Sequence, residues 1–61
     1  MSDRLAARLA ELRAQLRGVA AELDAMPRHL AGTEWHLDRA DEARFLARTI
    51  ARFESETAAG A

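Results

Sequence analysis

Two histidines and four acidic residues between positions 29 and 42 are the side chains that could hold a metal ion or transfer protons. They are His29, Glu34, His36, Asp38, Asp41 and Glu42. No histidine pair is spaced by one helical turn and no Glu-x-x-His motif is present, so the set matches no known metal site. We therefore expect no catalytic residue, no metal ligand and no cofactor, and the chain is predicted not to be an enzyme.

Arginines recur every four residues near the C-terminus, at Arg44, Arg48 and Arg52. This spacing places them on one side of a helix, where their guanidinium groups could contact phosphates. Acidic residues are interspersed among them, however, and nine basic against ten acidic residues give a net charge of -1. A general nucleic-acid binder carries excess positive charge. Binding of nucleic acid through this stripe is thus the alternative hypothesis.

The strongest pattern in the chain is a row of apolar residues spaced alternately by four and three. Its members are Leu5, Leu9, Leu12, Leu16, Val19, Leu23 and Met26. That spacing keeps one narrow apolar side on a helix, which is typical of a coiled coil or a helix bundle. We call this row the leucine seam and predict a helix over about residues 3–25, capped by Ser2 or Asp3.

Pro27 lacks an amide hydrogen and disfavours helical geometry at Met26, so it should end or kink the first helix. A turn over about residues 26–33 and a second helix over about residues 34–57 follow. The second helix is best supported from Ala40, and its start could be capped by Thr33 or by Asp38. A kinked helix that continues past Pro27 is the alternative.

Two helices joined by a short turn fold most simply into an antiparallel hairpin, so the fold class is all-α. Besides the leucine seam, a face on the second helix could form the core or bind a partner. The candidates are Trp35, Phe45, Leu46, Ile50 and Phe53. Leu30 and Leu37 complete the expected core. If the second helix starts early, Arg39 and Glu42 fall on its buried face and need each other, or Arg13 or Arg17, as partners.

Sixty-one residues without cysteine bury too little surface for a lone helical pair to be more than marginally stable. We therefore predict a homodimer that forms a four-helix bundle, with the leucine seam as its oligomer interface. In an antiparallel pair of first helices, Arg8 meets Glu22 of the other copy and Gln15 meets Gln15, whereas a parallel pair sets Arg8 against Arg13. The antiparallel arrangement is preferred.

No apolar run is long enough to span a bilayer, and charged residues interrupt any signal-peptide pattern at the start, so we expect no membrane association and a cytoplasmic location. The predicted function is a non-enzymatic interaction module: a small homo-oligomeric adaptor, chaperone or accessory subunit. It would bind a larger protein partner by helix packing.

Overall fold

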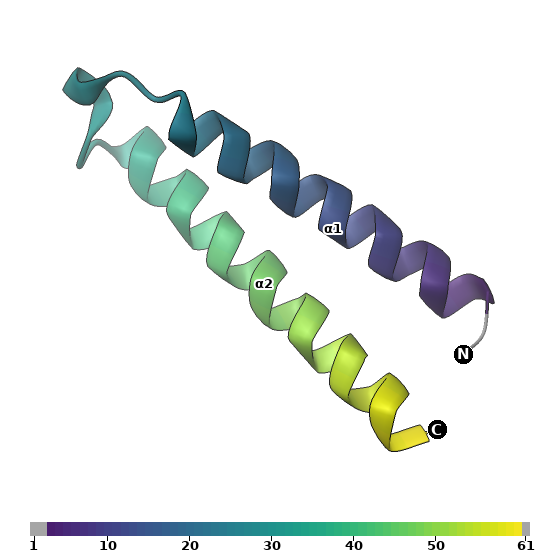
Figure 1. The fold of residues 1–61 in the computed structure, drawn as a ribbon. Coiled ribbons are helices and arrows are strands. Elements are labelled where there is room, and N and C mark those ends of the chain that lie inside the picture. The colour runs from purple at the N-terminus through teal and green to yellow at the C-terminus, as the bar shows by residue number, and fades with distance from the viewer. Residues whose placement is uncertain (1–2, 61) are drawn as a thin grey trace.

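The computed structural model describes residues 3–60, with side chains described for residues 3–58. Helix α1 spans Asp3–Asp24, a short 3-10 helix η1 spans Arg28–Leu30, and helix α2 spans Glu34–Gly60. Within that part of the chain every regular element is helical. Figure 1 shows α1 and α2 running antiparallel, with residues 25–33 joining them at one end. The predicted all-α helical hairpin is confirmed.

The core lies between the two helices and is small. Its buried side chains are Leu9, Leu12, Val19, Leu46 and Ile50. Leu16, Leu23, Ala43 and Phe53 pack against them and are partly buried. Every described member of α1 outside the leucine seam is exposed, so the alternating spacing of four and three does select the covered side of this helix.

The connection begins where α1 ends, at Asp24, and Pro27 adopts extended backbone geometry with φ -63° and ψ 147°. The backbone amide of Leu30 then donates to the carbonyl of Pro27, at 3.0 Å. Because Pro27 lies outside both long helices, the chain reverses in a full turn and the alternative of a kinked, continuing helix is wrong.

Helix α2 begins at Glu34 because its first turn is capped. The Thr33 hydroxyl donates to the carbonyl of Leu30 at 2.6 Å and accepts from the backbone amide of His36 at 3.4 Å. In return, Nδ1 of His36 accepts from the backbone amide of Gly32 at 2.8 Å. This reciprocal pair of contacts resembles a capping box. Of the two predicted caps, it is Thr33 that starts the helix, rather than Asp38.

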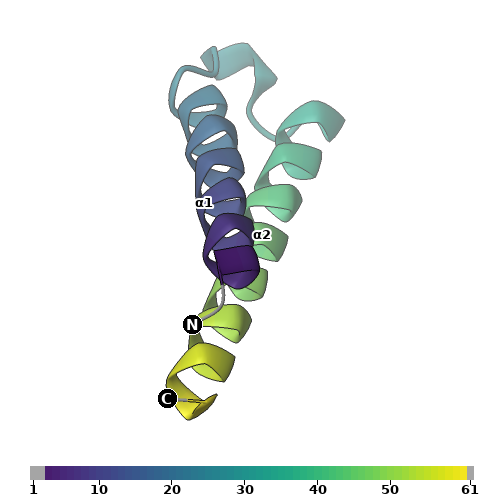
Figure 2. The same ribbon diagram turned by 90° about the vertical axis from the view of Figure 1, so that its right-hand side faces the viewer.

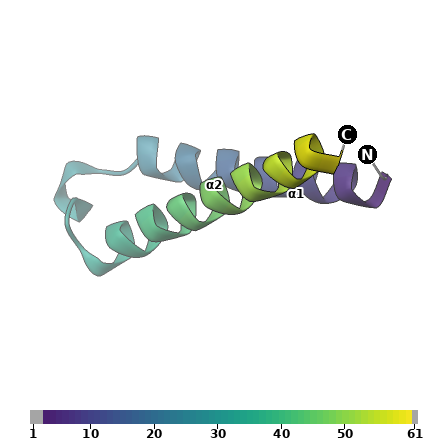
Figure 3. The ribbon, with the colours of Figure 1, turned by 90° about the horizontal axis from the view of Figure 1, so that it is seen from below.

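The two helices cross at an angle instead of lying flush along their whole length. Figures 2 and 3 show α1 and α2 apart near the connection, and Figure 1 shows them apart near the two termini, so the helices cross between these ends. The molecule is accordingly a rod, with principal extents of 46 × 15 × 12 Å. A rod of two helices covers only one side of each helix, and the opposite sides remain open to solvent.

Three sequence-based expectations need correction. Leu37 and Phe45 were expected in the core, but they are 53% and 63% exposed. Phe45 lies about 100° around the helix from Leu46, which is buried, so it cannot share that face. The second helix also ends at Gly60 instead of near residue 57, because two alanines, which strongly favour helix, follow Thr57. The predicted capping by Ser2 lies outside the described residues.

The small core makes stability sensitive to a single buried leucine. A chain of this length has a free energy of unfolding of roughly 3 to 9 kcal/mol. Leu12, which is 2% exposed, should lose about 2 to 5 kcal/mol on replacement by alanine, while Leu37→Ala on the open side of α2 should lose under about 1 kcal/mol. Urea unfolding followed by circular dichroism measures both. Equal losses would contradict the assignment of the core.

The two glycines in the described chain provide a matched test of the backbone. Gly32 has φ +79° and Gly18 lies inside α1, and an added Cβ meets nothing within 4 Å at either position. The same substitution should therefore act in opposite directions: Gly32→Ala should destabilise the hairpin by about 1 kcal/mol, because alanine disfavours positive φ, and Gly18→Ala should stabilise it by about 0.5 to 1 kcal/mol. Thermal unfolding of both variants at one protein concentration checks the signs.

Candidate interaction surface

The leucine seam packs against α2 of the same chain. Leu9, Leu12 and Val19 are 2%, 2% and 6% exposed because α2 covers them. The remaining members, Leu5, Leu16, Leu23 and Met26, are all of intermediate exposure. A second copy meeting the seam would therefore touch its margins and not its centre. The predicted pairing of first helices, with Arg8 near Glu22 of another copy, stays a prediction.

The candidate partner-binding residues of α2 divide into two groups. Leu46 and Ile50 are buried against α1 and Phe53 is partly buried, so these side chains hold the hairpin together. Trp35 and Phe45 are 40% and 63% exposed and remain available to a partner. Leu37, at 53% exposure, belongs with them although it was grouped with the core. Its opposite phase to Leu46 was the sequence signal that could have placed it on the open side.

Arg39 and Glu42 pair with each other, as one sequence-based alternative predicted. Arg39 also reaches Glu22 of α1, with 4.0 Å between their charged atoms. Neither Arg13 nor Arg17 partners Glu42 in the described chain. These side chains are 31% to 52% exposed, since they lie toward the end where the helices separate. Both charges consequently remain in contact with water, and no buried ion pair is needed to place them on this face.

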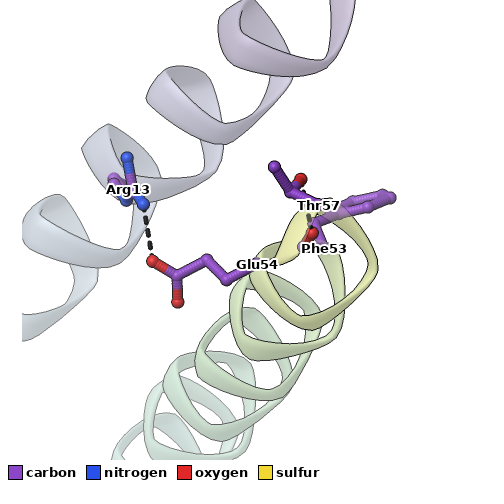
Figure 4. Close-up of polar contacts among 4 residues, drawn as sticks. All are labelled: Arg13, Phe53, Glu54 and Thr57. Atoms are coloured by element: carbon purple, nitrogen blue, oxygen red, sulfur yellow. Dashed lines mark hydrogen bonds and ion pairs between the residues drawn. The ribbon is translucent and has the colours of Figure 1, made fainter. Parts of the chain in front are cut away.

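A second contact between the helices lies farther from the connection, at the middle of α1. A terminal nitrogen of Arg13 on α1 donates to a carboxylate oxygen of Glu54 on α2 at 2.6 Å, as Figure 4 shows. The two side chains are 49% and 50% exposed. Together with Glu22 and Arg39, this pair links α1 and α2 by charge across the hairpin.

The arginine stripe is exposed but largely neutralised. Arg44 pairs with Asp41 at 3.4 Å and Arg52 pairs with Glu56 at 3.8 Å. Arg48 has no ion-pair partner among the described residues. Phe45, Arg48, Thr49 and Arg52 line an open depression on this side of α2. The depression thus combines an aromatic side chain, two guanidinium groups and a hydroxyl that already donates to the Phe45 carbonyl at 2.8 Å.

The histidine and carboxylate residues near the connection do not converge. Across residues 3–58, no three His, Asp or Glu side chains come close enough to hold a metal ion. His36 uses Nδ1 to accept the Gly32 amide and so serves the start of α2. The structure assigns this residue a capping role that the spacing of potential metal ligands did not indicate.

Comparisons with known protein families, curated proteins and solved structures find no match to this chain. In the described chain, neither helix combines the length and apolar character required to cross a membrane. The surface itself is therefore the source of functional information. Its features are three exposed apolar side chains on α2, namely Trp35, Leu37 and Phe45, and charged residues arranged around them.

The contact between Arg13 and Glu54 should contribute little to stability despite its short distance. Both side chains are about half exposed, and ion pairs in that setting contribute about 0 to 1 kcal/mol. A double-mutant cycle with Arg13→Ala and Glu54→Ala should give a coupling energy below about 1 kcal/mol that declines as salt is added. A coupling above about 2 kcal/mol would show that charge, more than the apolar core, holds the helices together.

Proposed function

We propose that this chain is a non-enzymatic protein-interaction module. In this proposal it is a small helical adaptor, chaperone or accessory subunit that self-associates and binds a larger protein by helix packing. The exposed apolar side chains and the absence of converging metal-ligating groups among the described residues are consistent with this function.

The observation that carries the proposal is the amount of surface the hairpin leaves open. Its accessible area is 4658 Å². A compact monomer of 6.7 kDa would expose about 3,900 Å². The difference, about 750 Å², is close to the roughly 800 Å² that each partner contributes to a standard protein interface. This excess of exposed surface supports the proposal that a partner covers part of the hairpin.

Helix packing against other chains is the natural way to cover this surface. Two hairpins would complete a four-helix bundle, which is the assembly we propose. Trp35 would serve as the anchor for a larger partner, because tryptophan is enriched among the residues that dominate interface energy. It is the second residue of α2 and therefore lies close to the connection at one end of the rod.

Affinity purification from a lysate of the native host tests the proposal. The wild-type hairpin should recover one protein in stoichiometric amount, and Trp35→Ala should reduce its recovery at least fivefold because the anchor is lost. Leu37→Ala is the matched control, since it truncates another exposed apolar side chain two residues away. Circular dichroism establishes that all three proteins are folded. Recovery of no protein, or equal recovery by Trp35→Ala, would contradict the proposal.

Binding of nucleic acid is the second candidate, favoured by one observation. Phe45 lies beside Arg48 and Arg52 in the depression on α2, where a base could stack while guanidinium groups contact phosphates. In the same purification, this function would appear as salt-dependent recovery of nucleic acid that is lost when Arg44, Arg48 and Arg52 are changed to glutamate. The net charge of -1 and the two internal ion pairs of the stripe weigh against it.

A further inference from the structure

The open side of α2 has a charge pattern that is complementary to itself. Exposed residues spaced by seven lie about two helical turns apart on the same side of the helix, so they form a line along it. We define the Phe45 strip as Asp38, Asp41, Phe45, Arg48 and Arg52, all of which are exposed. The two strip members that precede Phe45, Asp38 and Asp41, are acidic, and the two that follow it, Arg48 and Arg52, are basic. The strip is therefore negative at one end, positive at the other and aromatic in the middle.

We infer that the Phe45 strip is the docking site for a second copy of this chain, with the two α2 helices antiparallel and Phe45 at the two-fold axis. This inference rests on the self-association in the proposed function and specifies the surface that mediates it. Aromatic residues are enriched at the centre of interfaces, and Phe45 is the most exposed of the large apolar side chains on α2. At the axis it would pack on Phe45 of the second copy.

Symmetry about Phe45 sets opposite charges against each other. Asp38 and Arg52 lie seven residues on either side of Phe45, so each faces the other residue in the second copy. The other two members, Asp41 and Arg48, lie in the acidic and the basic half of the strip, so in the antiparallel arrangement each again meets the half of opposite charge. Each ion pair occurs twice because the axis repeats it. A parallel arrangement would instead face Asp38 with Asp38 and Arg52 with Arg52, which is repulsive.

The ion pairs within the hairpin leave most of this pattern available, although Asp41 is paired with Arg44 at 3.4 Å. Asp38 and Arg48 have no ion-pair partner in the described chain. Arg52 is paired with Glu56 only at 3.8 Å, and its side chain is 80% exposed. The depression formed by Phe45, Arg48, Thr49 and Arg52 gives a place for the ring of the second Phe45 to enter. The one unfavourable match is Glu34 with Glu56, eleven residues from the axis, where crossing helices have diverged.

Area also favours a second copy as the occupant. The surface in excess of that of a compact monomer, about 750 Å², corresponds to one side of a standard interface. The leucine seam cannot supply this area alone, because α2 already covers Leu9, Leu12 and Val19. The Phe45 strip lies on the side of α2 that remains open.

Sedimentation equilibrium of the full chain and its variants at micromolar concentrations tests the inference. The wild type should be a dimer, and Phe45→Ala should raise its dissociation constant at least tenfold. Asp38→Arg and Arg52→Asp should each weaken the dimer similarly, and the double variant with both changes should regain most of the affinity. This rescue is specific to the antiparallel arrangement. Leu37→Ala, which removes an exposed apolar side chain on another side of α2, should leave the dissociation constant unchanged.

Any of four other outcomes would overturn the inference, and each would identify which part of it is wrong. A wild-type dimer that tolerates Phe45→Ala and both charge reversals shows that the strip is not the interface, although self-association stands. A dimer that is weakened only by Arg8→Glu or Glu22→Arg shows that the first helices pair instead. A folded wild-type monomer removes the self-association in the proposed function as well. If the monomer binds nucleic acid or another protein through Arg52, the strip has a different occupant.

Discussion

One side of α1 must be kept from water, and α2 is the only other long helix within residues 3–60 that can cover it. This constraint explains most of the structure. The core has five buried side chains: from α1, Leu9, Leu12 and Val19 pack against Leu46 and Ile50 of α2. In the described part of the chain, no further long helix covers the outer side of α2. The same geometry that stabilises the hairpin thus leaves Phe45, Leu37 and much of Trp35 in contact with water.

The connection determines where that second helix can begin. Pro27 ends any continuation of α1, and Gly32 provides the positive φ that turns the chain toward α2. Thr33 and His36 then satisfy backbone groups at the start of α2. Because the start is fixed at Glu34, Arg39 and Glu42 lie toward α1, and they are accommodated by pairing at the separated end of the hairpin rather than by burial.

Local patterns predicted the elements well because they depend on neighbouring residues. The spacing from Leu5 to Met26 identified the covered side of α1, and Pro27 identified the break. The position of Phe45 was not predicted correctly, because an apolar residue type was counted toward the core although its phase relative to Leu46 placed it elsewhere. The start at Glu34 was uncertain because the charges of Arg39 and Glu42 conflict with a buried face, and the crossing of two helices that relieves this conflict depends on the tertiary structure.

Candidate surface residues were harder to predict than the helices for a related reason. Leu46 and Ile50 are apolar and could pack against a partner or against α1. Only the folded hairpin shows that α1 covers them. The exposed set became clear once the shared core was known. Electrostatic matching between copies depends on the spacing of charges along a single helix, and it can be worked out in this way for α1 and for α2 alike.

The start of α1 and the end of α2 lie at the same end of the rod, and the connection lies at the other (Figure 1). A domain fused ahead of Asp3 and another fused after Gly60 would therefore emerge side by side, about a helix diameter or two apart. The hairpin would hold the two fused domains near each other. The tip formed by residues 25–33 would project away from both and stay unobstructed.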